Sequence, residues 1–397
     1  MVVTYTCPPN HNWTLSGATC TREDCSSNQV RAKNGSCIAK TDAKDTGAPS
    51  PSLCIGNPVN AGTGGKFHSE GIYAVAGESS GFAYALSYQS RPSSSQYHPA
   101  NRHGLFWFNR FDRSLSPDGT LSATTAPAAV YATRPDGQLI DFRLVSGAYK
   151  PDADITHKLI RKTDPGGATS GWQITGGEGD ELETYDATGR FVSLTDVRGR
   201  VQTLGYDANG RLATITDGFG HTLTLANDAQ NRVISLTQLD GQTVGFAYSA
   251  ANNLTTITWP GGATRTYHYE NTSFPNNLTG ITDENGARFA TYSYDTSGRA
   301  NLTEHANGAQ RATLSFGTNS TTVTDAVGTS RTYTLTTVLN VVRGVGSNQP
   351  SGSGCGPASS ALSYDGNGNV ASRTDFNGVV TSYTYDLSRN LETQRIE

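Results

Sequence analysis

Tyr206-Asp207-Ala208-Asn209-Gly210-Arg211 is one copy of a phrase, Tyr-Asp-x-x-Gly-Arg, that returns along the second half of the chain. Tyr185 precedes Tyr206 by 21 residues, and Tyr364 and Tyr385 are again 21 residues apart. A fixed period of this length indicates a repeat architecture, in which each unit is one supersecondary element stacked on the next. The structural repeat positions are Tyr185, Asp186, Gly189, Arg190, Tyr206, Asp207, Gly210, Arg211, Tyr248, Tyr269, Tyr294, Asp295, Gly298, Arg299, Tyr364, Asp365, Tyr385 and Asp386.

Each unit contains two turns separated by strand-like segments. The first turn, Asp207 to Gly210, carries the Asn-Gly pair of a tight hairpin in which both central residues have positive φ. We therefore expect positive φ at Gly210 and at Gly298. The second turn, Asp217 to Gly220, is predicted to be a longer glycine-containing loop. The segments between the turns are rich in Thr and large apolar residues, which predicts strands.

The apolar pattern of these strands predicts where the repeated rings lie. Phe246 and Tyr248 are two residues apart, so they share one face and stack against the rings of the next unit. In the opposing strand Leu212 and Ile215 are three residues apart, which predicts bulk on both faces. We interpret the tyrosines as core, and a sugar-stacking surface is the alternative. The arginines that follow the first turn either pack on neighbouring rings or are solvated: Arg190, Arg211, Arg232 and Arg299.

Composition limits the function classes. The 397 residues carry a net charge of −4, and only 16% are charged, so no basic surface for nucleic acid is expected. No segment reaches the roughly 18 apolar residues that a membrane span needs. The Met1-Val2-Val3 start lacks the basic and apolar regions of a signal peptide, so either a leader has been removed or export does not use one.

Five of the six cysteines gather at the N-terminus, in a segment too polar to build its own core. We favour a disulfide-linked cap over a zinc site, because no Cys-x-x-Cys pair occurs and His11 stands alone. Six cysteines allow 15 pairings, among which we suggest Cys54 with Cys355. The candidate disulfide cysteines are Cys7, Cys20, Cys25, Cys37, Cys54 and Cys355.

Several patterns suggest enzyme chemistry without meeting its requirements. The segment from Asn60 to Lys66 lacks the first Gly and the final Ser/Thr of a phosphate-binding loop. The acidic run from Glu178 to Glu183 is interpreted as a solvated loop rather than a metal site. No His stands in a recognisable nucleophile motif such as Gly-x-Ser-x-Gly, and nothing in the sequence nominates a Ser/His/Asp arrangement. We therefore predict no catalytic residue, no cofactor and no metal.

These repeats resemble the YD-repeat, or Rhs, family, and the resemblance extends upstream of Tyr185. Three upstream segments resemble the part that precedes the repeats in that family: Gly56–Asn60 with Thr63-Gly64, Gly104–Phe108 leading to Arg113-Ser114-Leu115, and Arg134–Gly137. The resemblance covers roughly residues 54 to 397. Members of the family carry an Asp-Pro self-cleavage motif after the shell, but Asp164-Pro165 precedes the repeats and is interpreted as a turn.

The resemblance implies a function. It implies a non-enzymatic scaffold, part of a shell that encloses and helps to deliver a polymorphic C-terminal toxin, in a secreted or cell-surface bacterial protein. Its partner would be the rest of its own longer chain, including the toxin cargo. The alternative is a carbohydrate-binding or adhesion module that contacts cell-surface glycans, and a glycan-cleaving enzyme is a further rival.

The predicted fold is all-β: stacked antiparallel hairpins that form a curled spiral sheet. We divide the chain into a Cys-rich cap (1–54), a β-rich entry segment (55–184) and the repeats (185–397). A loop that leaves the ladder is expected between Gly344 and Pro357. The unit at Tyr385 is expected to lack its partner strand, which would leave an apolar edge for self-association or for further repeats.

Overall fold

The computed structural model describes residues 14–16, 19–21, 25–26, 29–31, 37–40, 44–74, 83–90, 102–118, 124–177, 180–350 and 358–397. Regular structure in these ranges is almost entirely β-strand, with a single-turn 3₁₀ helix, η2 (Ala306–Gly308), between two strands. The predicted all-β class is confirmed.

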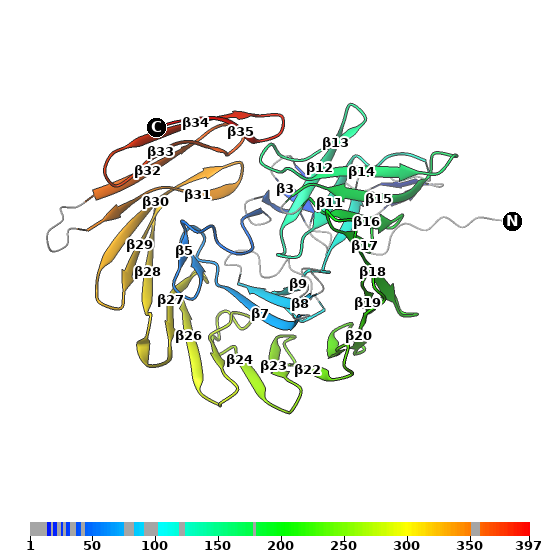
Figure 1. Cartoon of the computed structure of the whole chain (residues 1–397), viewed down its shortest axis with the longest axis horizontal. Coiled ribbons are helices and arrows are strands. Elements are labelled where there is room, and N and C mark those ends of the chain that lie inside the picture. Colours follow the sequence, from blue (N-terminus) through cyan, green and yellow to red (C-terminus); the bar gives the residue numbers. More distant parts are fainter. Residues whose placement is uncertain are drawn as a thin grey trace.

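One antiparallel sheet dominates the molecule. It contains 22 strands, β14 to β35, and each strand pairs with the strands that precede and follow it in sequence. Figure 1 shows that the sheet bends into an arc, with β5 and β7–β9 inside it. The strands are β14 (Lys158–Thr163), β15 (Thr169–Thr175), β16 (Leu182–Asp186), β17 (Phe191–Thr195), β18 (Val201–Tyr206), β19 (Leu212–Thr216), β20 (Thr222–Asn227), β21 (Val233–Thr237), β22 (Thr243–Tyr248), β23 (Leu254–Thr258), β24 (Thr264–His268), β25 (Gly280–Thr282), β26 (Arg288–Tyr294), β27 (Ala300–His305), β28 (Ala312–Gly317), β29 (Ser320–Asp325), β30 (Ser330–Val338), β31 (Val341–Gln349), β32 (Ala358–Tyr364), β33 (Val370–Thr374), β34 (Val380–Asp386) and β35 (Leu391–Ile396).

The preceding residues form smaller antiparallel sheets. A four-stranded sheet contains β10 to β13, a three-stranded sheet contains β7 to β9, and three hairpins pair β1 with β2, β3 with β4 and β5 with β6. The strands are β1 (Thr14–Ser16), β2 (Thr19–Thr21), β3 (Gln29–Arg31), β4 (Cys37–Ala39), β5 (Cys54–Ile55), β6 (Val59–Asn60), β7 (Phe67–Ala74), β8 (Ala83–Gln89), β9 (Trp107–Asn109), β10 (Ser114–Asp118), β11 (Ala129–Thr133), β12 (Leu139–Val145) and β13 (Ala148–Lys150).

Both turns of a repeat unit have the same conformation. In the first, the Gly210 amide donates to the Asp207 carbonyl at 2.9 Å, and the Asp207 amide donates to the Arg211 carbonyl at 2.9 Å. In the second, Asp217, Gly220 and His221 make the same two bonds. This is the three-residue loop in which a type I turn is followed by a left-handed residue. The prediction of a longer second loop is wrong.

In the turn from Asp207 to Arg211, positive φ is confined to the last loop residue. Gly210 has φ 74° and Gly298 has φ 75°, as predicted, whereas Asn209 does not have a positive φ. The tight hairpin with two left-handed residues is therefore a wrong prediction. The side chain of Asp207 explains why this loop forms instead of the predicted hairpin turn. Its Oδ1 accepts hydrogen bonds from the amides of Asn209 and Arg211, both at 2.9 Å. That bonding fixes a type I turn and leaves only Gly210 left-handed.

A β-bulge places the apolar residues of each unit on one face. Tyr206 is opposite Leu212 while Gly205 is opposite Thr214, so Ala213 is an extra residue in its strand. The bulge resets the alternation, and Leu212 and Ile215 are both buried in the same hydrophobic cluster. The prediction of bulk on both faces is therefore wrong. The other face carries exposed residues such as Thr203 and Thr224.

Two expectations about the C-terminal part are also wrong. Residues Gly344 to Gln349 belong to β31 rather than to a loop, and residues 351–357 lie outside the described ranges. Gly344 allows close packing, because a Cβ there would lie 3.2 Å from Leu53 Cδ2. The unit at Tyr385 has its partner strand, since β34 pairs with β35 and Ser382 is opposite Ile396. The expected self-association through a missing partner strand therefore loses its structural basis.

The cap contains a disulfide between Cys25 and Cys37, with a Cα to Cα distance of 5.6 Å. Cys54 is a free, exposed thiol, so the suggested bridge from Cys54 to Cys355 is wrong. Cys7, Cys355 and the side chain of Cys20 lie outside the described residues. The three-part division of the chain remains a prediction, although the continuous sheet already begins at Lys158, within the predicted entry segment.

Substitution at Gly210 tests the turn conformation without a packing effect, because nothing lies within 4 Å of a Cβ built there. We expect Gly210→Ala to lower the free energy of unfolding by about 1–2 kcal/mol through backbone strain alone. Gly218→Ala is the control, since Gly218 lies in an equivalent loop, lacks a left-handed φ and has no neighbour closer than 3.6 Å. Equal losses in the two variants, measured by urea unfolding, would contradict the assignment.

Candidate functional site

The repeated tyrosine ties each hairpin to the one before it. The hydroxyl of Tyr206 donates to the Phe191 carbonyl at 2.6 Å, and Tyr248 donates to the Val233 carbonyl at 2.6 Å, each 15 residues back. Tyr294 and Tyr364 donate in the same way to the carbonyls of Leu278 and Gly344. The tyrosine therefore satisfies a backbone acceptor of its neighbour while its ring packs at the margin of the core.

The repeated tyrosine position keeps its hydrogen bond to the preceding hairpin where another residue occupies it. Asn227 replaces tyrosine in one unit, and its Nδ2 donates to the Leu212 carbonyl at 2.8 Å, again 15 residues back. Two tyrosines at the same position bind elsewhere: the hydroxyl of Tyr269 accepts from Trp107 Nε1 at 2.9 Å, and Tyr185 donates to Glu183. What recurs is a polar group at a fixed place on the sheet.

The repeated Asp and Arg connect the turn to the next ring. Nε of Arg232 donates to Asp228 Oδ2 at 2.7 Å, and its guanidinium carbon lies 4.7 Å from the ring centroid of Tyr248. Arg190 stacks on Tyr206, also at 4.7 Å. The expected cation–π contacts are therefore present at these positions. Arg299 lies over the Phe316 ring, and Arg211, which has Asn227 in place of a ring, donates to the Asp228 carbonyl.

The entry segment runs along the sheet in the opposite direction to the repeats. Its later residues contact early repeats and its earlier residues contact late repeats. The amide of Leu115 donates to the Gly189 carbonyl at 2.8 Å, and the amide of Leu105 donates to the Asn252 carbonyl at 2.8 Å. Further back in the entry segment, the Gly64 carbonyl accepts from the amide of Ala300 at 2.7 Å, and the Ala61 carbonyl accepts from the hydroxyl of Thr321 at 2.6 Å.

Left-handed glycines make these approaches possible. A Cβ on Gly104 would lie 2.5 Å from the Asn252 carbonyl oxygen, and one on Gly64 would lie 2.4 Å from Arg299 Cβ. On the repeat side, a Cβ on Gly189 would lie 2.2 Å from the Leu115 carbonyl oxygen. Both upstream glycines belong to the motifs that the sequence singled out, so those motifs are docking points on repeat turns.

A buried ion cluster joins Arg113 of the second upstream motif and Arg134 of the third to β16. Glu183 is 2% exposed and accepts from Arg134 Nη1 at 2.7 Å and Nη2 at 2.5 Å, and also from Arg113 and Tyr185. Glu181 pairs with Arg110. The interpretation of the acidic run as a solvated loop is therefore wrong for Glu181 and Glu183, while Glu178 lies outside the described residues.

The protonation of Glu183 follows from its partners. Burial on its own would raise the pKa of Glu183, but the hydrogen bonds from Arg134 and the charges of Arg134 and Arg113 lower it to about 2. The carboxylate is therefore ionised at neutral pH. Thr184 and Tyr185 are residue types that favour a strand, but no local pattern marks Glu183 as buried.

A second polar cluster joins β7 to β24. Glu70 accepts from Arg265 Nη1 at 2.7 Å and from the hydroxyl of Tyr267 at 2.7 Å, and it contacts His68. Nearby, Lys66 is fully buried, donates to the Asn57 carbonyl at 2.6 Å and lies over the Tyr292 ring at 4.3 Å. Sequence reasoning missed Glu70 because its partners lie almost 200 residues further along, at separations of 195 and 197.

These groups connect parts of the chain that are distant in sequence. In the part of the chain that the structure describes, no group of three or more His, Cys, Asp or Glu side chains is placed to hold a metal ion. Within the same ranges, no helix is both long and apolar enough to cross a membrane. A groove of about 400 Å³ passes the free thiol of Cys54 and hairpin residues such as Val323 and Tyr333.

Neutralising Glu183 tests the ion cluster. Glu183→Gln leaves Arg134 buried without its paired anion and leaves Arg113 only the contact with Glu181 at 3.4 Å, so we expect a loss of about 3–5 kcal/mol in the free energy of unfolding at pH 7. Glu392→Gln removes the acid of an exposed pair with Arg395, and solvent screening should make its effect on stability far smaller.

The same variant has a predicted pH dependence. The folded pKa of Glu183 lies below its ordinary value of 4.5, so its contribution is present above that value and is lost as the pH falls toward about 2. The stability difference between the natural chain and Glu183→Gln should therefore shrink in acid, as measured by urea unfolding at several pH values. A difference that stays constant from pH 7 to pH 3 would refute the assigned ion pair.

Comparison with known proteins identifies the repeats and shows similar solved structures. One similar protein is the chain in the crystal structure of TcdB2-TccC3-TEV, to which this chain is 12% identical in sequence. The match has a TM-score of 0.37 and covers 81% of this chain and 22% of that one. TcdB2-TccC3 without its hypervariable C-terminal region is 12% identical, with a TM-score of 0.35, over 85% and 21%. The Photorhabdus luminescens Tc holotoxin pore is 15% identical, with a TM-score of 0.29, over 69% and 15%.

The chain spans about a fifth of the length of the first two of these structures. No curated protein matches it. The family model RHS Repeat matches residues 185–222, 228–264 and 364–397, where the Tyr-Asp phrase recurs. This chain therefore contains RHS repeats, which form three segments of its hairpin stack.

Proposed function

We propose that this chain is the N-terminal part of an Rhs-type shell, a non-enzymatic scaffold that encloses and helps to deliver a toxin cargo carried by the same, longer polypeptide. The cargo, the secreted or cell-surface destination and the bacterial source are parts of this proposal. Its partner would be the remainder of its own chain.

One observation carries the proposal. The 22 strands follow one another in sequence order and bend into an arc, with the entry segment docked along its inner side (Figure 1). A wall built in sequence order can be lengthened by further units without rearranging those already present, because each unit contacts mainly its neighbours. That is the property that a shell around a cargo requires.

The chemistry of the repeated residues supports a scaffold over the glycan-binding alternative. The ring of Tyr185 is 1% exposed, and the hydroxyls of Tyr206 and Tyr248 are engaged by backbone carbonyls of the same chain. Rings that stack sugars must offer a free face. The carboxylates of Glu70 and Glu183 are likewise engaged by arginines of this chain, which supports a structural role for them.

The proposal is tested on the whole natural polypeptide. We expect the reading frame that contains residues 1–397 to continue through further Tyr-Asp units to a dissimilar C-terminal region. Limited proteolysis of that polypeptide should leave the C-terminal region intact under conditions that digest the same region expressed alone. A C-terminal region that is digested equally fast in both forms, or a reading frame without further units, would overturn the proposal.

A further inference from the structure

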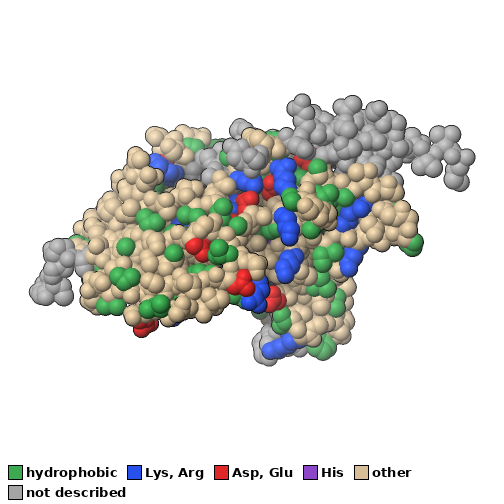
Figure 2. All heavy atoms as spheres, turned by 90° about the horizontal axis from the view of Figure 1, so that it is seen from above, with side chains coloured by type: hydrophobic (Ala, Val, Ile, Leu, Met, Phe, Trp, Pro, Cys, Tyr) green, Lys and Arg blue, Asp and Glu red, His purple; other side chains and the backbone are tan. Residues whose placement is uncertain are grey.

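The curl of the sheet brings residues from its two ends to one place. Asn390, in the turn between β34 and β35, donates through Nδ2 to the Ala153 carbonyl at 2.7 Å, across 237 residues. Arg343 of β31 lies 3.9 Å from Asp154. We call this junction the seam, formed by Asp152–Asp154 on one side and by Leu339–Arg343 with Asn390 on the other. Figure 2 views the molecule from the side of β34 and β35, and charged side chains gather in a band across that face.

We propose that Lys40, Lys44 and Asp45 form a clasp that holds the seam closed, and that the curl of the sheet opens at this seam. The three residues follow the disulfide-linked hairpin β3–β4 and contact both sides of the seam. The proposal concerns how the shell is closed, so it deepens the proposed function, yet its test depends only on this chain.

Lys44 is the centre of the clasp. Its Nζ donates to Asp152 Oδ2 at 3.1 Å and to Asp154 Oδ1 at 2.7 Å on one side of the seam. On the other side it donates to the Leu339 carbonyl at 2.9 Å, across 295 residues. The side chain of Lys44 is only 4% exposed, so all three donors of the ammonium group are used inside the protein.

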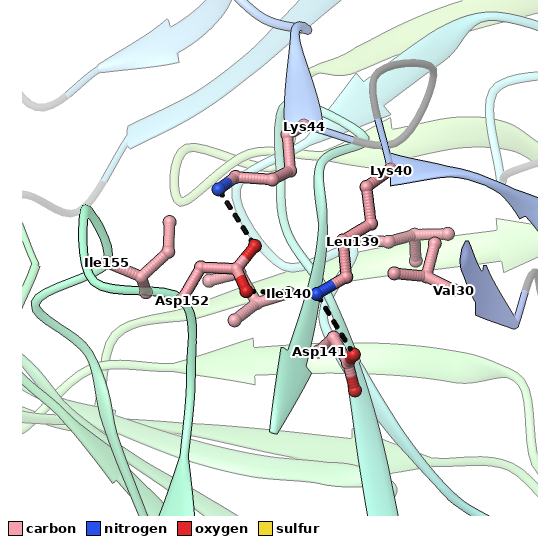
Figure 3. A pocket seen from close by; sticks show the side chains of 8 residues that line it. All are labelled: Val30, Lys40, Lys44, Leu139, Ile140, Asp141, Asp152 and Ile155. Carbon is pink, nitrogen blue, oxygen red and sulfur yellow. Dashed lines mark hydrogen bonds and ion pairs between the residues drawn. The ribbon is translucent and has the colours of Figure 1, made fainter. Parts of the chain in front are cut away.

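Lys40 and Asp45 extend the clasp in the two directions. Lys40 Nζ lies 2.9 Å from Asp152 and 3.4 Å from Asp141, which fixes the clasp to β12 (Figure 3). Asp45 Oδ2 accepts from the amide of Val342 at 2.8 Å, which fixes it to the start of β31. The space between Lys40, Lys44 and Asp152 measures about 10 Å³, so it holds at most one water molecule and is not a ligand site.

In the ranges that the structure describes, apolar packing anchors the clasp on one side of the seam and not on the other. Val30 and Ile38 of its hairpin are buried with Ala129, Tyr131 and Leu139 of the β10–β13 sheet. Among the described residues, none of the three hydrophobic clusters joins residues 129–157 to residues 336–397. The connections across the seam that the structure shows are hydrogen bonds and ion pairs.

Polar closure differs from apolar closure in how easily it is reversed. The attraction of a buried ion pair is largely offset by the cost of removing its charges from water, so the net gain on closing is small. Loss of one partner leaves the other charge buried and alone, and this strongly favours separation. A seam closed by Lys44 is therefore a defined place at which the arc can open while the apolar clusters elsewhere stay intact.

Hydrogen exchange on three forms of the chain tests the clasp. Lys44→Met removes the ammonium group, and Lys158→Met is the matched control, because Lys158 is exposed and lies at the start of β14, close to the seam in sequence. We expect the amide of Val342 to exchange about tenfold faster or more in Lys44→Met and unchanged in Lys158→Met. Amides of β20–β23 should exchange at the natural rate in both variants.

Two results would overturn the proposal. One is a Val342 amide that exchanges as slowly in Lys44→Met as in the natural chain. The other is an equal acceleration at Val342 and in β20–β23, which would make Lys44 a general stabilising residue. If Lys44→Met does not fold, Asp154→Asn provides the same test, because it removes the anion shared by Lys44 and Arg343. Neither result bears on whether a cargo is enclosed.

Discussion

The hydrogen bond from the repeated tyrosine to the carbonyl of the preceding hairpin is the interaction on which the sheet depends. A stack of identical hairpins needs a rule that fixes how each unit sits on the last, and Tyr206 and Tyr248 provide the same bond at the same separation. The arginine that follows the turn adds a second link, from its own Asp to the next ring. The Tyr-Asp-x-x-Gly-Arg phrase therefore specifies contact between neighbouring units.

Contacts between neighbouring repeat units do not by themselves set the shape of the whole sheet. Stacked hairpins twist, so curvature accumulates along the sheet, and setting that curvature requires a template. The entry segment provides it, because it runs against the repeats and docks on their turns through residues such as Gly64 and Gly104, where no larger side chain fits. Glu183 and Glu70 then join this segment to the sheet by buried ion pairs, which give orientation more than stability.

Much of the local structure could be predicted from the sequence, because turns and periodicity are local properties. The hairpin units and the left-handed Gly210 and Gly298 follow from composition and spacing. The bulge at Ala213 could not be predicted, because alternation rules assume that each residue has one partner. Glu183 was misinterpreted for another reason: its partners Arg134 and Arg113 lie 49 and 70 residues upstream, and only the fold brings them together.

The repeated tyrosine hydroxyl joins neighbouring units, and its contribution to the free energy of hairpin opening can be measured by hydrogen exchange. Tyr385 provides the comparison, because the described residues offer its hydroxyl no hydrogen-bond partner. Hydrogen exchange should show that Tyr206→Phe lowers the opening free energy of the β17–β18 amides by about 1 kcal/mol. Tyr385→Phe should leave the β33–β34 amides unchanged. An unchanged opening free energy in Tyr206→Phe would contradict the account.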